Sequence, residues 1–418
     1  MAQEIKNNGG KMNIQNLAVG NFFSYYIVHP FHETLKPLDK LIATVASGIL
    51  LTLGLGLVHA VCMIRYRAHI FSKVPPQSRV PVPTPPINPP PQAVNPLTPP
   101  ISKTVSKLES MIETLKNGDA TQQKKAQLYE LGLKLHGGAL SEPQTFRLNQ
   151  GDLRDNYLQD SYHANSPQVL SDRGFYDYNP STGAHEDVWV DFANSSLGGG
   201  CFTYGFVQEE IMVAETPDFA NYIASHQSST KRGWCDISIR NGDIGTRMNV
   251  GQGTPNPLLL RGLHRVQEID TNQAYGKKFE SITDIQRIVR PLPQPQKYDV
   301  LAIAAPRLTS TQPSEQHAPA TVKDIFDTLM AGFTLVKNQS TPGMTPMIHT
   351  GKLGCGVFHN DPKLVIMLQM LAASHLDLDI KFWGTSPQEI TQAQQTMNGL
   401  NLYGKSLQQC LDEIARSL

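Results

Sequence analysis

The stretch that most constrains this chain runs from Val190 to Ile211 and reads VDFANSSLGGGCFTYGFVQEEI. An apolar, partly β-branched segment at 188–192 predicts the end of a buried strand. The three glycines 198–200 then remove every Cβ, so that another backbone or a ligand can approach closely. Glu209 and Glu210 follow eleven and twelve residues past the first glycine. Together these pieces predict a site for an extended polar ligand, with acid/base chemistry at one end.

The charge balance and the cysteines exclude several classes of protein. Lys+Arg and Asp+Glu both number 36 in 418 residues, so no global basic footprint for nucleic acid exists and we expect no direct DNA binding. The five cysteines are widely spaced, and no CxxC or Cys/His metal spacing occurs. We therefore expect no disulfide framework, no metal site and no cofactor, and a reducing compartment for the large domain.

Residues 41–64 form an apolar run of 24 residues without Asp, Glu, Lys or Arg. At about 1.5 Å per residue a helix of this length covers about 36 Å, enough to cross about 30 Å of hydrocarbon. A signal peptide is disfavoured because the run starts forty residues into the chain, and a buried core helix is the alternative. Basic residues at 65, 67, 73 and 79 favour a cytosolic C-terminal side. These features predict a single-pass membrane protein whose large domain faces the cytosol.

Composition divides the chain into five segments. Residues 1–37 are a mixed lead-in, 38–66 hold the predicted transmembrane helix, and 67–100 form a Pro-rich linker. Of the 30 prolines, 12 lie between positions 75 and 100, which predicts a stiff stalk or a docking segment for an SH3-like partner. Residues 101–136 have helical spacing, broken at 117–119, and predict two accessory helices. Residues 137–418 form the large domain.

Within the large domain the apolar pattern alternates between strands and helices. The expected strands are 188–192, 211–213, 258–261, 300–304, 347–349 and 380–383. The expected helices are 219–225, 322–335, 363–375, 386–397 and 407–418. This alternation predicts a layered α/β fold with a mostly buried mixed sheet.

A second glycine loop, TGKLGCGVFHND at 350–361, precedes the expected helix at 363–375. A glycine loop that leads into a helix N-terminus is a general anion site, because free amides and the helix dipole point at the ligand. From its chemistry alone, this loop fits any phosphate group, or only a tight turn.

The two loops together resemble the poly(ADP-ribose) glycohydrolase branch of the macro domains. The family signature is VDFAN, then GGG, then seven residues, then QEE, and this chain has it at 190–194, 198–200 and 208–210. The second loop is similar to the family's diphosphate loop, TGxWGCGxFxxD, with Leu353 in place of tryptophan. Weaker similarities lie at 258–265, 274–276 and 300–305. The resemblance implies a macro-domain-like three-layer α/β/α fold with a mixed sheet, preceded by the transmembrane helix and the Pro-rich linker.

The resemblance also implies roles for individual residues. Cleavage of a glycosidic bond needs a proton donor for the leaving oxygen and a water that meets the oxocarbenium-like carbon. Glu210 is implied as the proton donor and later the base for water, and Glu209 as the residue that positions the ribose hydroxyls. The implied substrate-binding residues are Asn194 and Gln208 at the distal ribose, Gly198, Gly199, Gly200, Gly354, Cys355, Gly356, Val357 and Phe358 at the diphosphate, Tyr275 as a clasping tyrosine, and Trp383 or Phe358 near the adenosine.

The implied function is that of a membrane-anchored ADP-ribosyl glycohydrolase that acts on poly(ADP-ribose) or ADP-ribosylated protein and releases ADP-ribose. The anchor at 41–64 would suit an enzyme at a membrane surface, and a secreted bacterial effector is one such setting. A hydrolase specific for mono-ADP-ribose on one side chain is an alternative, because the same loops would hold the same ADP-ribose. A non-catalytic ADP-ribose-binding macro domain is a further alternative, against which the retention of both glutamates argues.

Overall fold

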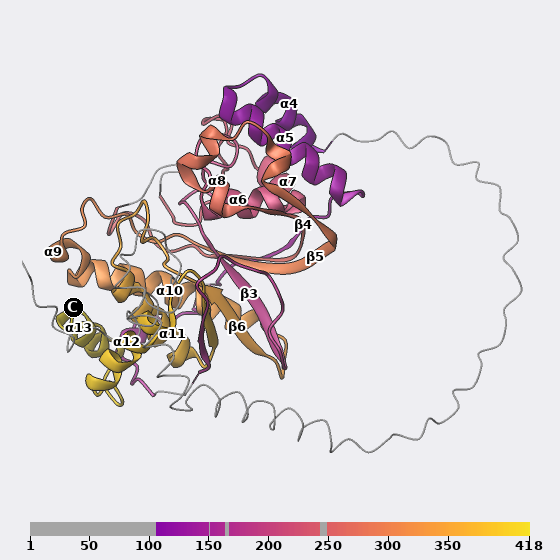
Figure 1. Ribbon diagram of the computed structural model, residues 1–418. Helices are drawn as coiled ribbons and strands as arrows, with labels where there is room; N and C mark the ends of the chain where they lie inside the picture. The colour runs from indigo at the N-terminus through magenta and orange to yellow at the C-terminus, as the bar shows by residue number, and fades with distance from the viewer. Residues whose placement is uncertain (1–105, 150, 164–166, 243–248) are drawn as a thin grey trace, which may run out of the picture. The chain divides into compact units, whose positions relative to one another are not determined.

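A seven-stranded mixed sheet organises the part of the chain that the computed structural model describes, residues 106–149, 151–163, 167–242 and 249–418 (Figure 1). The strand order is β1-β4-β5-β3-β6-β7-β2. The strands are β1 (Gln144–Phe146), β2 (Val169–Ser171), β3 (His185–Phe192), β4 (Leu258–Ile269), β5 (Val289–Ile303), β6 (Thr345–Thr350) and β7 (Asp379–Phe382). Strands β5, β3, β6, β7 and β2 are parallel neighbours, whereas β4 pairs antiparallel with both β5 and β1.

Helices cover both faces of this sheet (Figure 1). On one face lie α4 (Lys107–Lys116), α5 (Ala120–His136), α6 (Gln208–Glu215) and α7 (Pro217–Ser225), with the short α8 (Thr271–Ala274) nearby. On the other face lie α10 (Pro319–Gln339), α11 (Pro362–Leu376), α12 (Pro387–Gly399) and α13 (Leu407–Arg416), with the short α9 (Pro313–Gln316) before α10. Short 3-10 turns occupy Tyr157–Gln159, Gly276–Ser281 and Ile285–Arg287.

The central strand β3 feeds both hydrophobic cores because its side chains alternate between the faces of the sheet. Val188 and Val190 are fully buried against the layer of α10 and α11. Trp189, between them, is 2% exposed and packs in the core formed with α4 to α7. The sheet therefore lies between two helical layers, as expected for an α/β fold whose parallel strands are covered on both faces.

Most of the predicted elements are present, and one is wrong. The expected strand 211–213 belongs to helix α6, whose first turn is closed by a hydrogen bond from Val207 N to Glu210 Oε2 of 2.9 Å. Three apolar residues are too few for periodicity to separate a strand from a buried helix. The glutamate at the third helical position is the signal that favours a helix start here.

The two helices predicted before the large domain are α4 and α5. Each begins with a capping box, formed by Ser106 with Glu109 and by Asp119 with Gln122. The break falls at Asn117 and Gly118, as the sequence indicates. The division into accessory helices at 101–136 and a macro domain at 137–418 stays a prediction.

No helix among the described residues is long and apolar enough to span a membrane. Helix α11 is apolar but has 15 residues, about 22 Å, and α10 carries four charged side chains in its 21 residues. The predicted single-pass membrane localisation with a cytosol-facing domain is contradicted by this finding, and we do not retain it. The predicted span at 41–64 lies outside the described residues, as do the lead-in at 1–37 and the linker at 67–100.

Candidate active site

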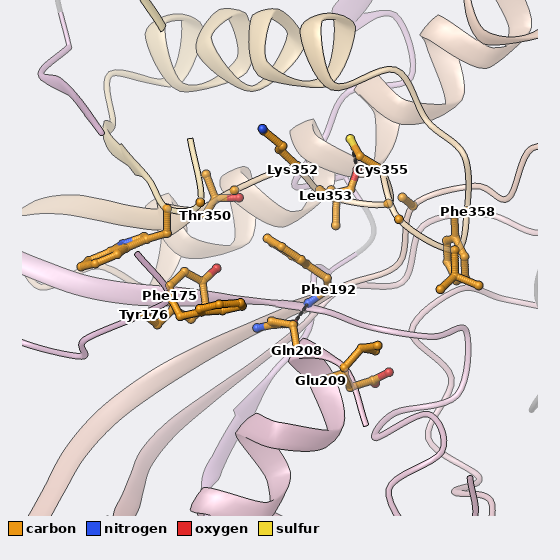
Figure 2. Close-up of a pocket in the computed structure, with 18 of the residues that line it drawn as sticks. Phe175, Tyr176, Phe192, Gln208, Glu209, Thr350, Lys352, Leu353, Cys355 and Phe358 are labelled. Carbon is orange, nitrogen blue, oxygen red and sulfur yellow. Dashed lines mark hydrogen bonds between the residues drawn. The ribbon is translucent and has the colours of Figure 1, made fainter. Parts of the chain in front are cut away.

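A cavity of about 780 Å³ opens where the parallel strands of the sheet end. Its lining includes residues just past the carboxyl ends of β3, β5, β6 and β7. Open α/β sheets bind ligands at this edge, and small-molecule sites typically measure about 300–1,000 Å³. In Figure 2, Gln208 and Glu209 approach from α6, and Lys352, Leu353 and Cys355 lie across the site on the loop after β6.

The structure brings most of the predicted site residues to this one cavity. Those in its lining are Asn194, Gln208, Glu209, Glu210, Tyr275, Gly354, Cys355, Gly356, Val357, Phe358 and Trp383. The glycines 198–200 are buried but are not part of the lining. The roles of all these residues stay predictions, and their surroundings show what each can do.

Glu209 and Glu210 occupy the first turn of α6 and are 4% and 6% exposed. Glu210 accepts two backbone hydrogen bonds of 2.9 Å, one at Oε1 from Gly200 N and one at Oε2 from Val207 N. Glu209 accepts one at Oε2 from Asn194 N, at 3.0 Å, while its Oε1 is buried without a hydrogen-bond partner among the described residues. The backbone thus fixes both carboxyl groups at the cavity wall.

Asp191 is a third buried carboxyl group in this cluster, and the sequence analysis did not select it. It is 0% exposed, and neither oxygen has a hydrogen-bond partner among the described residues. Burial and then the charge of Glu210 raise its pKa well above the usual range. Burial, followed by the charges of Asp191 and Glu210, likewise raises the pKa of Glu209. A carboxylate inside an apolar strand, seven residues before the first glycine of the loop, was the signal available in the sequence.

Gly199 shows what the triple glycine accomplishes. Its φ is +48°, and a Cβ there would lie 2.4 Å from Glu209 Oε2 and 3.0 Å from Glu210 Oε1. No side chain fits between this backbone and the two carboxyl groups. The close approach at Gly199 is therefore to the glutamates, and the predicted role of the three glycines at a bound diphosphate stays a prediction.

One face of α5 holds this glycine loop from behind. Gln122 Nε2, Lys125 Nζ and Tyr129 Oη donate hydrogen bonds of 3.3, 2.6 and 2.9 Å to the three consecutive carbonyl groups of residues 200–202. Lys125 is 1% exposed, and burial lowers the pKa of its ammonium to about 8, against the opposing effect of Glu210. A lysine at core spacing with Leu128 was the available signal. Helix α5 thus supports the loop that seats the glutamates.

The loop after β6 forms the opposite wall and leads into the N-terminus of α11. Gly354 has φ +68°, and a Cβ there would lie 2.4 Å from Asn360 Nδ2, which bonds the Gly354 carbonyl at 3.1 Å. Lys352 and Arg173 add positive side chains to the lining, and neither was selected from the sequence. Asp361 already caps the N-terminus of α11, and Lys352 pairs with Glu389 at 2.7 Å. The loop amides and the two cationic side chains at the lining are what suit this wall to an anionic ligand.

Trp383 is mainly a core residue at the cavity wall. It is 5% exposed, and its Nε1 donates to His349 Nδ1 at 3.1 Å, while His349 Nε2 lies 2.6 Å from Asp187 Oδ1. This buried chain orients the indole. The ring is therefore less available as a stacking platform than the sequence analysis expected.

Tyr275 and Gln208 meet at the mouth of the cavity. Tyr275 is 37% exposed, and its ring lies 5.6 Å from that of Phe175, between ring centroids. The pKa of Tyr275 is raised, chiefly by burial and then by the charge of Glu210. The backbone N–H of Gln208 donates a hydrogen bond to the Tyr275 hydroxyl. The side-chain amide of Gln208 bonds Phe192 N at 2.9 Å and Val190 O at 3.2 Å. Both polar atoms of this side-chain amide are therefore hydrogen-bonded to the backbone at the end of β3. The predicted contact of Gln208 with a ribose would have to form beside these bonds.

The geometry defines an α/β domain with a cluster of buried carboxyl groups that faces a glycine loop across the cavity. Residues 258–392 match the family model described as poly(ADP-ribose) glycohydrolase (PARG), macro domain fold. Over this region, which is less than half of the chain, the sequence is similar to the PARG macro-domain family. The match includes Tyr275, the loop after β6 and Trp383, and it begins beyond the glutamate pair.

Solved structures with the same family name are also similar to this chain. The poly(ADP-ribose) glycohydrolase of Thermomonospora curvata is 13% identical, covers 75% of this chain and 98% of its own, and has a TM-score of 0.36. The same enzyme bound to the inhibitor ADP-HPD is 13% identical over 68% and 97%, with a TM-score of 0.37. The Deinococcus radiodurans enzyme in complex with ADP-ribose is 13% identical over 64% and 97%, with a TM-score of 0.35. The search of curated proteins found no match.

Proposed function

We propose that this domain is an ADP-ribosyl glycohydrolase that cleaves the ribose glycosidic bond of poly(ADP-ribose) or of ADP-ribosylated protein and releases ADP-ribose. The observation that carries the proposal is the buried pair Glu209 and Glu210, held at the wall of a cavity whose opposite wall is suited to phosphate. A glycosidase needs a carboxyl group that keeps its proton near neutral pH, and burial among like charges provides one.

In the proposed mechanism Glu210 protonates the leaving oxygen as the bond to the ribose C1 breaks, and it then accepts a proton from the attacking water. Glu209 orients the ribose hydroxyls. The diphosphate lies along the loop 351–358, with Lys352 and Arg173 at its edge. Tyr275 closes over the ligand from the mouth of the cavity, where its ring already meets that of Phe175.

The raised pKa belongs to Glu209, which is not the residue assigned as the proton donor. Coupled carboxyl groups share their protons, so the retained proton belongs to the cluster with Asp191 rather than to one residue. The assignment of Glu210 rests on the resemblance of the sequence motif, and the burial of the cluster supports the availability of a proton. Comparison of the two glutamine variants decides which glutamate donates it.

A module that only binds ADP-ribose is less well supported. Burying three carboxyl groups costs stability, the more so because oxygens of Asp191 and Glu209 lack hydrogen-bond partners among the described residues. A binding module gains nothing from protonated acids at this position. The cavity does not separate polymer from mono-ADP-ribosylated protein as substrate, because both present the same ADP-ribose.

The test uses the full chain with poly(ADP-ribose) and with proteins mono-ADP-ribosylated on Arg, Ser or Glu. We expect release of ADP-ribose from at least one substrate, its loss in Glu210→Gln with ADP-ribose binding retained, and a smaller loss in Glu209→Gln. Glu142→Gln, at an exposed position, is the control and keeps full activity. A chain that binds ADP-ribose but releases none from any substrate would be a binding module. Full activity in Glu210→Gln would refute the assigned donor.

A further inference from the structure

We propose that His136, Asp218 and His264 form a binding site for a divalent transition-metal ion of the zinc type, separate from the cavity. His136 ends α5, Asp218 lies in the first turn of α7, and His264 lies in β4. One ligand atom from each residue can be chosen so that all three lie within 4.8 Å of one another. None of the three lines the cavity of the candidate active site.

The distances between the donor atoms suit a small cation. His136 Nε2 lies 3.4 Å from Asp218 Oδ1, and His264 Nδ1 lies 2.8 Å from Asp218 Oδ2. Bonds of about 2.0–2.1 Å to zinc place neighbouring ligands of a tetrahedral site about 3.3–3.4 Å apart. The first distance already meets this spacing. The second involves the other carboxylate oxygen and is shorter than this spacing by about 0.5 Å, so the His264 ring must move away from Asp218 by about that amount.

The donor set and its burial indicate which ions fit. Two imidazole nitrogens and one carboxylate suit zinc and its first-row neighbours better than calcium or magnesium, which prefer oxygen ligands alone. Asp218 is 1% exposed, and the backbone N–H of Ser141 holds its Oδ1 at 2.9 Å. A fixed second contact of this kind orients a ligating carboxylate. The His264 side chain is 33% exposed, so solvent can supply a fourth ligand from that side.

The three proposed ligands come from separate parts of the chain, so no local sequence motif predicts the site. Helix α5 ends at His136 with Gly137 in the left-handed conformation, and the chain then reaches Ser141 beside Asp218. A bound ion would tie the end of α5 to α7 and β4. We therefore expect metal binding to stabilise the attachment of α5, the helix that supports the glycine loop.

The experiment measures zinc uptake and thermal unfolding of the full chain after treatment with a chelator and desalting. We expect stoichiometric zinc on re-addition and a melting temperature that rises with free zinc concentration. Cobalt(II) in place of zinc should give the visible absorption of a four-coordinate site. These signals should be lost in His264→Asn, which alters a partly exposed side chain, and in His136→Asn.

The matched control is His185→Asn. His185 Nε2 lies 2.9 Å from Asp379 Oδ2, so it forms a similar His–Asp pair without a second histidine in the cluster. This variant should take up zinc like the wild type. The proposal is overturned if the wild type takes up no zinc, or if His264→Asn and His136→Asn bind zinc as the wild type does. Stability that changes with pH but not with zinc would show a hydrogen-bonded cluster instead and would also overturn it.

Discussion

Replacing Lys125 by methionine preserves the length of the side chain and removes a buried ammonium group. In the wild type Lys125 Nζ donates a 2.6 Å hydrogen bond to the Gly200 carbonyl, directly behind the glutamates. A charge-assisted hydrogen bond contributes roughly 1.5–3 kcal/mol to stability. Burial also penalises the charged ammonium and lowers its pKa from 10.5 to about 8. This shift corresponds to a penalty of roughly 3.4 kcal/mol. These two effects nearly cancel, so we expect Lys125→Met to change stability near pH 7 by about 2 kcal/mol or less.

The pH dependence of stability separates the two effects. Between pH 8 and 10.5 the unfolded chain still binds the proton of Lys125 while the folded chain has released it, so stability increases with pH. Integrated from about pH 7 to about pH 9.5, this contribution amounts to roughly 2 kcal/mol in the wild type. The methionine variant lacks it.

The assay is urea unfolding of both proteins at a series of pH values across this window. The difference in free energy of unfolding between wild type and Lys125→Met should shift by roughly 2 kcal/mol in favour of the wild type as the pH rises. Lys134→Met, at an exposed position on the same helix, should give a curve parallel to the wild type. If the curve of Lys125→Met is also parallel, the lysine is not buried as described and the reasoning fails.

Three further predictions concern neighbouring positions. Gly199→Ala places a Cβ 2.4 Å from Glu209 Oε2 and should lower turnover by about tenfold or more, whereas Gly399→Ala meets nothing within 4 Å and should leave turnover unchanged. Asp191→Asn removes a carboxyl group whose pKa is raised by burial, and such a group destabilises the fold increasingly as the pH rises above its pKa in the unfolded chain. The variant should therefore unfold at a higher urea concentration near pH 7, and its stability should depend less on pH. Arg265→Met leaves the buried carboxylate of Glu215 without its charged partner. The variant should lower the free energy of unfolding in denaturant by roughly 3–5 kcal/mol.

The sequence could predict those parts of the fold and site that are encoded locally. The apolar runs at 300–304 and 347–349 lie inside β5 and β6, because buried parallel strands read as continuous apolar segments. The glycine loops and the glutamate pair could be found because each lies within about twenty residues. The register that brings the loop at 350–358 opposite α6 depends on β3 pairing with β6, which no single segment encodes.

The residues that sequence reasoning missed act across long distances in the chain. Lys125 reaches Gly200, 75 residues away, and looks like a helix-surface lysine until α5 is docked. Lys352 and Arg173 line the cavity from different loops. Asp191 was visible within a strand, but its burial without partners depends on the helices that cover that strand. Burial and docking, which decide these roles, are properties of the assembled layers.

Helix α5 therefore belongs to the chemistry of the proposed reaction as well as to the fold, although it lies outside the matched residues 258–392. Donation of a proton to the leaving oxygen leaves one more negative charge in the carboxyl cluster. The ammonium of Lys125, which already interacts with Glu210, lies where it can stabilise that added charge in a water-poor environment. An interaction that strengthens as the transition state forms raises turnover rather than substrate affinity. Under the proposed mechanism Lys125→Met should thus reduce kcat and leave KM nearly unchanged, and a rise in KM at constant kcat would assign the lysine to ligand binding through the loop instead.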